Sequence, residues 1–137
     1  MGPNLNMLGL RDPEKYGSFT LKDIENLCVD TAKKLEMNID FRQSNHEGEL
    51  VTWIQEARGQ FDGLMINAGA YTHTSIAIHD ALEIFDGLII EVHQSEPLKR
   101  EKFRHISYIT PQANCVISGL KEQSYVKGLE KLADILQ

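Results

Sequence analysis

The chain has little cysteine, no long apolar run and no export signal, and each absence narrows the class of protein. Its two cysteines, Cys28 and Cys115, stand far apart without metal-site spacing. We therefore expect free thiols of a reducing compartment rather than a disulfide framework. No apolar run approaches the roughly 20 residues that span a bilayer, and residues 1–8 lack the charged start and apolar stretch of a signal peptide. These features predict a cytoplasmic protein that does not contact a membrane.

An excess of positive charge is also missing. The chain has 14 Lys and Arg against 20 Asp and Glu, so its formal charge is 14 − 20 = −6. Neutralisation of phosphates dominates nucleic-acid affinity, so we expect no nucleic-acid partner. The 137 residues, 42% of them apolar, suffice to bury a real core. We expect a single catalytic domain over residues 1–137.

The sequence lacks several common catalytic and binding motifs. It has no HExxH zinc-protease motif, no GxSxG elbow of a hydrolase, and neither GxGxxG nor a phosphate-binding Gly-Lys-Ser/Thr loop. Nucleotide binding is therefore disfavoured. A flavodoxin-like module that binds a nucleotide or accepts a phosphoryl group stays open as an alternative, because one fold hosts many functions.

Short apolar runs alternate with segments of helical periodicity. Runs at 63–66, 88–92 and 115–117 predict buried strands, and alternation around Ile39 and Phe41 predicts another. Four helices are predicted: one capped by Thr20 with Asp23, one capped by Ser44-Asn45, one over 75–84, and a last one carrying Tyr125 to Leu136. Strands separated by such helices imply βαβ units and a parallel sheet, whose ligands bind at the carboxyl ends of the strands.

Two pairs of side chains suggest acid–base chemistry. Glu91 and His93 lie on one side of a predicted strand end, where a carboxylate favours the protonated imidazole that a general acid needs. Arg11 and Tyr16 share the N-terminal loop, where a guanidinium stabilises a phenolate. The plainer interpretations are a solvated ion pair for the first and unrelated loop residues for the second.

Two loops suggest anion binding. Residues 67–74 offer backbone N–H groups before a helix, which suits a carboxylate or phosphate, although a simple turn has the same sequence. Arg100, Arg104 and His105 cluster in the loop after the predicted strand at 88–92. They would clamp an anionic or polyhydroxylated ligand, but such runs are more often solvated.

Six segments together resemble type II 3-dehydroquinate dehydratase. They are GPNLNMLG (2–9), RDPEKYG (11–17), QSNHEGE (43–49), INAGAYTHTS (66–75), IEVH (90–93) and REKFRH (100–105). They follow the family's order and spacing over nearly the whole chain. The resemblance implies a flavodoxin-like three-layer α/β sandwich with a parallel sheet and a homododecamer, a tetramer of trimers. It also implies conversion of 3-dehydroquinate to 3-dehydroshikimate and water in the shikimate pathway, with no metal or organic cofactor.

The resemblance also implies a role for particular side chains. Tyr16 is the base, Arg11 holds it near the phenolate form, Asn4 supports the enolate through a water, and His93 is the acid that Glu91 orients. The substrate-binding residues implied are Asn67, Ser95 and the backbone of Gln94 for the carboxylate, His73 and Arg104 for the hydroxyls, and Asp80 for a neighbouring subunit's site. Gly9 and Gly17 flank a loop expected to close over the substrate.

The chain departs from the family in three places. Only Met1 precedes Gly2, where the family has an apolar first strand, so that strand is apparently absent from this chain. Glu96 adds negative charge next to the expected carboxylate pocket, and residues 118–125 replace a glycine-rich turn. These departures keep open the alternative of a catalytically silent or truncated member that binds ligand or only assembles.

Overall fold

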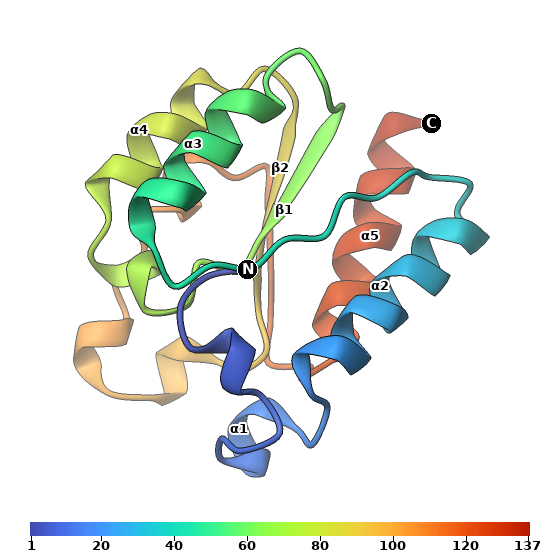
Figure 1. Ribbon diagram of the computed structural model, residues 1–137. Coiled ribbons are helices and arrows are strands. Elements are labelled where there is room, and N and C mark those ends of the chain that lie inside the picture. The colour runs from blue at the N-terminus through green and yellow to red at the C-terminus, as the bar shows by residue number, and fades with distance from the viewer.

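Three parallel strands lie between two layers of helices in the computed structural model, which describes residues 1–137 (Figure 1). The strands β1 (Gly63–Ile66), β2 (Leu88–His93) and β3 (Cys115–Ser118) pair in the order β1-β2-β3. Both pairs are parallel, with Gly63 opposite Leu88 and Ile90 opposite Cys115. This arrangement confirms the three-layer α/β class expected from the sequence.

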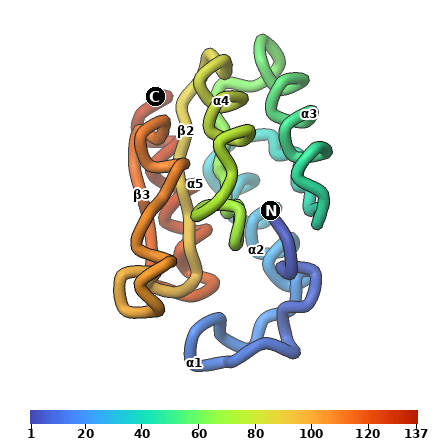
Figure 2. The backbone as a smooth tube through the Cα atoms, turned by 90° about the vertical axis from the view of Figure 1, so that its left-hand side faces the viewer, coloured from blue at the N-terminus to red at the C-terminus, as the bar shows by residue number.

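Each face of the sheet is covered by two helices. Figures 1 and 2 show α3 (Glu47–Ala57) and α4 (Ile76–Ile84) on one face, and α2 (Leu21–Lys34) and α5 (Gln123–Leu136) on the other. A buried apolar cluster fills each interface, so the protein has one core on either side of the sheet. None of the helices combines the length and apolar character that a bilayer span requires.

The predicted starts of α2 and α4 are confirmed. The predicted capping residues of α3, Ser44-Asn45, are wrong. Thr20 and Asp23 form a reciprocal capping box at α2, and Ser75 caps α4. Helix α3 follows His46, whose side chain makes no cap. Ser44 instead accepts the His46 amide N–H at 2.9 Å and donates to the Glu49 carboxylate at 2.7 Å. Ser44 therefore stabilises the start of α3, although it lies two residues before His46.

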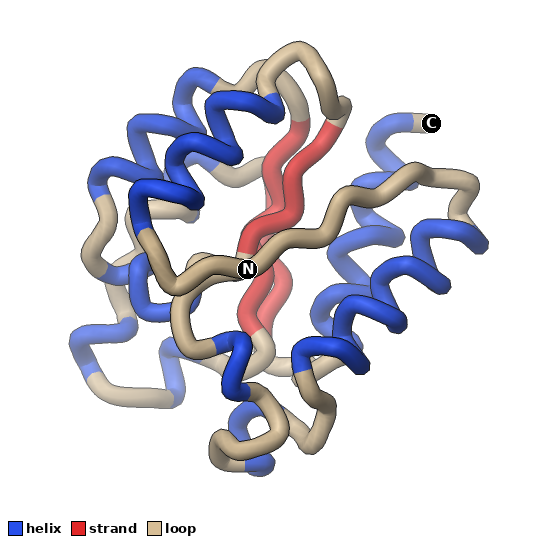
Figure 3. The backbone as a smooth tube through the Cα atoms, in the orientation of Figure 1, coloured by secondary structure: helices blue, strands red, loops and turns tan.

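The strand predicted around Ile39 and Phe41 is wrong. Both side chains are half-buried between exposed neighbours, as the alternation requires, yet residues 38–43 form no strand and no backbone–backbone hydrogen bond. Figure 3 shows this segment as a loop passing the strands. An alternating pattern predicts which side chains are buried. A strand also needs a neighbouring strand whose backbone N–H and C=O groups form hydrogen bonds with its own.

Two residues, Met1 and Gly2, link the chain just after this segment to the chain just after β1 through backbone bonds. The Ser44 amide donates to the Met1 carbonyl at 3.1 Å, and the Gly2 amide donates to the Asn67 carbonyl at 2.8 Å. Met1 and Gly2 thus bond to both sides, as residues of a strand between them would. We call this connection the Met1–Gly2 bridge; the edge of β1 facing residues 38–43 is otherwise unpaired.

Three irregular segments gather at the carboxyl ends of the strands (Figure 2). The first is the N-terminal loop with α1 (Pro13–Tyr16), the second follows β1, and the third is the long connection from β2 to β3. The short helix α1 starts where Asp12 accepts the Glu14 amide at 3.0 Å and Pro13 occupies the first turn. These segments supply the candidate site.

Candidate active site

A pocket of about 120 Å³ lies at the carboxyl ends of the strands. Of the residues selected from the sequence, those that line it are Asn4, Arg11, Tyr16, Asn67, His73, His93, Gln94, Ser95 and Arg104. Arg100 lines it as well, whereas Glu91, Asp80 and His105 are not in its wall. Three segments distant in sequence therefore converge on one place, the end of the sheet where parallel α/β folds bind ligands.

A wider depression of about 490 Å³ lies at the opposite end of the sheet. Its lining includes Asp62 and Asp86 but no histidine, arginine or lysine. It offers neither an acid–base pair nor a counter-ion for an anion. We therefore place the chemistry in the smaller pocket.

Tyr16 stands at the C-terminus of α1 between two guanidinium groups. An Arg11 nitrogen donates to the Tyr16 hydroxyl at 2.7 Å, and the guanidinium carbon lies 3.9 Å from the ring centroid. The Arg100 guanidinium carbon is 5.3 Å from the same ring. The ring is only 7% exposed, so little water screens these cations. Two cations therefore lie against this side chain, one of them bonded to its hydroxyl.

Arg100 also lines the pocket, and the sequence did not predict its contact with Tyr16. The sequence grouped it with Arg104 as a candidate clamp, whereas the structure brings it to Tyr16 and bonds it to the Ser95 hydroxyl at 3.1 Å. Its Nε is buried without a hydrogen-bond partner. An unpaired buried donor in a pocket wall is a group that a polar ligand can satisfy.

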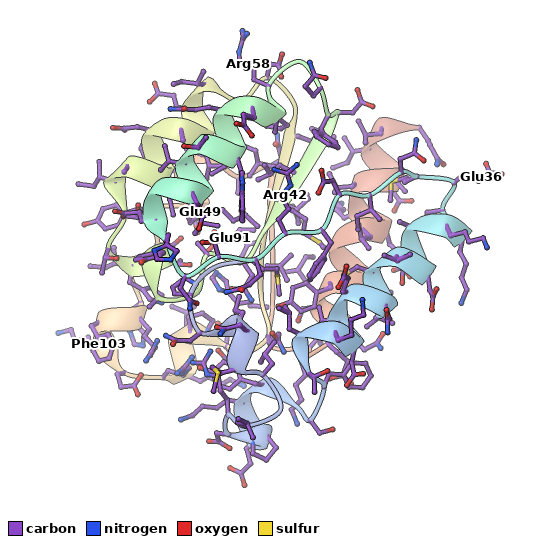
Figure 4. The ribbon with its side chains drawn as sticks, in the orientation of Figure 1. Glu36, Arg42, Glu49, Arg58, Glu91 and Phe103 are labelled. Atoms are coloured by element: carbon purple, nitrogen blue, oxygen red, sulfur yellow. The ribbon has the colours of Figure 1, made fainter.

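His93 and Glu91 form a buried pair at the end of β2, as the two-residue strand period predicts. His93 Nε2 and Glu91 Oε2 are 2.5 Å apart, and the two residues are 8% and 1% exposed. Figure 4 places Glu91 inside the protein. Because Nε2 is engaged by the carboxylate, Nδ1 is the His93 nitrogen left for a ligand in the pocket.

Two hydroxyl groups also donate hydrogen bonds to the Glu91 carboxylate, and the sequence analysis did not identify either of them. Ser107 donates to Glu91 Oε2 at 3.0 Å and Thr110 donates to Oε1 at 2.5 Å. Burial acts to raise the pKa of Glu91, but the hydrogen bonds from His93, Thr110 and Ser107 outweigh it and hold that pKa below its ordinary value. Glu91 is therefore ionised at neutral pH.

The lowered pKa of Glu91 predicts how stability changes in acid. A carboxyl group whose pKa is lower in the folded state contributes stability above its unfolded pKa and loses that contribution as pH falls through the folded pKa. Glu91→Gln is expected to cost about 2 kcal/mol at pH 7, because charge-assisted bonds are lost. The difference between wild type and variant shrinks as pH falls below the ordinary value of 4.5.

Urea unfolding of both proteins over a pH series measures this difference. Glu36→Gln is the control, because Glu36 is exposed and makes no ion pair or side-chain hydrogen bond. A Glu91→Gln deficit that stays constant through the acid range would contradict the prediction.

His73 lies across the pocket as a neutral hydrogen-bonding group. Its Nδ1 is 2.7 Å from the Ile106 carbonyl, which can only accept, so Nδ1 carries the proton. Burial lowers the pKa of His73, the charges of His93 and Arg104 lower it further, and the bond to Ile106 opposes them. The ring therefore offers an unprotonated Nε2, an acceptor suited to a hydroxyl group.

Asn4 and Asn67 also line the pocket. Asn4 has a left-handed backbone with φ 66°, and the side chain of Asn45 fixes it by accepting its amide N–H at 3.0 Å. The Asn67 Oδ1 accepts the Gly69 amide at 3.1 Å, and its Nδ2 donates to the Tyr125 hydroxyl at 2.8 Å. Asparagine adopts this left-handed conformation more readily than most residues, and the bond to Asn45 fixes its position at the pocket.

Two acidic residues that the sequence singled out lie away from the pocket. Asp80 is exposed on α4 beside His79 and Glu83, and their ligand atoms all lie within 4.8 Å. Nδ1 of His79 is already bonded to the Tyr108 carbonyl at 2.7 Å. Glu96 accepts the Ser118 hydroxyl at 2.6 Å and the Leu98 amide at 3.2 Å, so its charge points out of the pocket.

Comparison with known proteins identifies the family. The family model described as dehydroquinase class II matches residues 1–133. A Streptomyces coelicolor protein named 3-dehydroquinate dehydratase is 56% identical over 96% of this chain and 85% of its own length. One from Pseudomonas putida, named 3-dehydroquinate dehydratase 2, is 52% identical over 99% of this chain and 91% of its own.

A solved structure with the same fold is the type II dehydroquinase from Propionibacterium acnes. It superposes with a TM-score of 0.93 at 35% identity, covering 97% of this chain and 92% of that one. The Butyrivibrio crossotus type II dehydroquinase superposes with a TM-score of 0.92 at 41% identity, covering 96% and 92%. With the pocket described above, these matches show that the chain belongs to the class II dehydroquinase family.

Proposed function

We propose that this protein is a cytoplasmic 3-dehydroquinate dehydratase of the shikimate pathway that uses Tyr16 as base and His93 as acid. The observation that carries the proposal is that the two side chains have neighbours of opposite charge. Arg11 donates to the Tyr16 hydroxyl and Arg100 lies against the Tyr16 ring, whereas the Glu91 carboxylate is bonded to Nε2 of His93. Elimination of water next to a ketone needs one group of each kind.

The reaction proceeds by anti elimination in two proton transfers. The Tyr16 phenolate takes a proton from C2 of 3-dehydroquinate, and the C–H electron pair forms the enolate. A water held by Asn4 stabilises the enolate oxygen. The enolate then reforms the ketone as the C1–O bond breaks, and His93 gives its proton to the departing hydroxyl, which leaves as water. No step needs a metal or an organic cofactor.

In this proposal the pocket has a carboxylate side, which binds the carboxylate of the substrate, and a hydroxyl side, which binds its ring hydroxyls. Asn67, Ser95 and the backbone of Gln94 would hold the substrate carboxylate, since neutral donors there are buried and already oriented. His73 and Arg104 would bind the ring hydroxyls, one as acceptor and one as donor.

Assembly belongs to the same proposal. Asp80 would reach a neighbouring subunit's site in a homododecamer, a tetramer of trimers. Large apolar side chains stand exposed near the pocket and at the start of α4: Phe103 at 64%, Ile106 at 60% and Ile76 at 58%. Figure 4 shows Phe103 pointing outward from the edge of the molecule. Such groups support an interface with other copies of the chain.

The test is to mix the purified protein with 3-dehydroquinate in the presence of a chelator and follow the ultraviolet absorbance of the conjugated enone product. We expect turnover that the chelator leaves unchanged. Folded protein that binds the substrate without turnover would instead support the catalytically silent member. Folded protein that neither binds nor turns over the substrate would reject the dehydratase and leave the member that only assembles.

A further inference from the structure

A chain of buried hydrogen bonds runs from the carboxylate side of the pocket to the main chain of Tyr16. The Asn67 amide donates to the Tyr125 hydroxyl at 2.8 Å, which donates to Gln94 Oε1 at 2.7 Å. Gln94 Nε2 then donates to the Tyr16 carbonyl at 2.9 Å. Asn67, Tyr125 and Gln94 are 4%, 1% and 2% exposed, so water does not compete for these bonds.

The direction of every bond in this chain is determined. The Tyr16 carbonyl can only accept, so Gln94 must present its amide NH₂ to Tyr16 and its oxygen to Tyr125. The single Tyr125 hydrogen then goes to Gln94, and the hydroxyl oxygen accepts from Asn67. Burial raises the pKa of Tyr125, which keeps this hydroxyl neutral and able to do both. Donors aligned in one direction reinforce one another.

The bond to Tyr16 is the most consequential of these links. The Tyr16 carbonyl lies at the C-terminus of α1, where no later helical amide can reach it, and no other hydrogen bond satisfies it. Gln94 directly follows His93. One side chain therefore joins the segment that carries the proposed acid to the segment that carries the proposed base.

We propose that Gln94 is a positioning residue that fixes the separation of Tyr16 and His93, and that Tyr125 extends this control to Asn67 in the carboxylate side of the pocket. The proposal rests on the proposed function for its kinetic consequences. Gln94 acts through the Tyr16 main chain and through Tyr125. Its side chain makes no contact with the reacting atoms.

Three variants test the proposal. Gln94→Met keeps the length of the side chain and removes both bonds. Gln94→Glu can keep both bonds while its carboxyl is protonated, since the hydroxyl donates to Tyr16 and the other oxygen accepts from Tyr125. Tyr125→Phe leaves the Gln94–Tyr16 bond in place and cuts the link to Asn67. Asn114→Ala is the matched control, because it removes a bond to the Ile89 amide outside the pocket.

For Gln94→Met we expect kcat to fall by about tenfold to a hundredfold, because a misplaced reacting group costs that much, with a smaller change in KM. Gln94→Glu is expected to recover most of kcat at low pH and lose it as pH rises through the new carboxyl's pKa. Wild type has no such step. Tyr125→Phe is expected to raise KM more than it lowers kcat, because the substrate carboxylate contacts Asn67.

A second measurement is independent of turnover. Lys15 is exposed and precedes Tyr16, so release of α1 should speed tryptic cleavage after Lys15. We expect faster cleavage in Gln94→Met and wild-type cleavage in Asn114→Ala. The proposal would be overturned if Gln94→Met showed unchanged cleavage and a kcat within about twofold of wild type. It would also be overturned if Asn114→Ala lost as much kcat as Gln94→Met. If wild type fails to turn over 3-dehydroquinate, the proposed function fails while the cleavage comparison still tests the positioning.

Discussion

Replacing Tyr16 by phenylalanine is expected to lower kcat by about a thousandfold, because general base catalysis by a positioned side chain contributes on that order. The ring stays in its apolar surroundings and only the hydroxyl is lost, together with the bond from Arg11. The substrate contacts assigned to other residues remain, so KM should change far less than kcat. Steady-state kinetics on 3-dehydroquinate measure both constants.

Tyr108→Phe is the control for this variant. The Tyr108 hydroxyl makes no hydrogen bond and lies outside the pocket, so its removal should leave kcat unchanged. A Tyr16→Phe enzyme that retains more than about a tenth of wild-type kcat would reject Tyr16 as the base.

Replacing His93 by alanine is expected to lower kcat by about a thousandfold or more, since the hydroxyl would have to leave without its acid. The same variant separates the two proton transfers. The proposed base, Tyr16, is still present in His93→Ala, so exchange of the C2 proton with solvent deuterium should continue in that variant. It should stop in Tyr16→Phe. Mass spectrometry of substrate recovered from D₂O measures the exchange.

His46→Ala provides the matched control, because His46 is exposed at the start of α3 and its side chain makes no cap. Loss of C2 exchange in both Tyr16→Phe and His93→Ala would show that the two side chains do not act in separate steps. That outcome contradicts the assignment of one base and one acid.

The local features of the fold were predictable from the sequence. The Thr20 cap, the apolar runs of β1 and β2 and the pairing of Glu91 with His93 all depend on residues within a few positions of one another. Periodicity and capping report such relations directly.

The features that were not predictable depend on partners distant in sequence. Residues 38–43 alternate like a strand, yet strand formation depends on a neighbouring backbone that periodicity does not report. Arg100 meets Tyr16, and Ser107 and Thr110 meet Glu91, only because irregular segments fold over the sheet. No local pattern marks a hydroxyl in a loop as the partner of a buried carboxylate.

The Met1–Gly2 bridge also connects a distant helix to the pocket. Its two bonds run to Ser44, which is bonded to the start of α3, and to Asn67 in the pocket wall. Asn4 lies two residues beyond Gly2 and lines the same pocket. A displacement of α3 should therefore move Asn4 and Asn67 together. This part of the pocket thus depends on the position of a helix that contributes no residue to its wall.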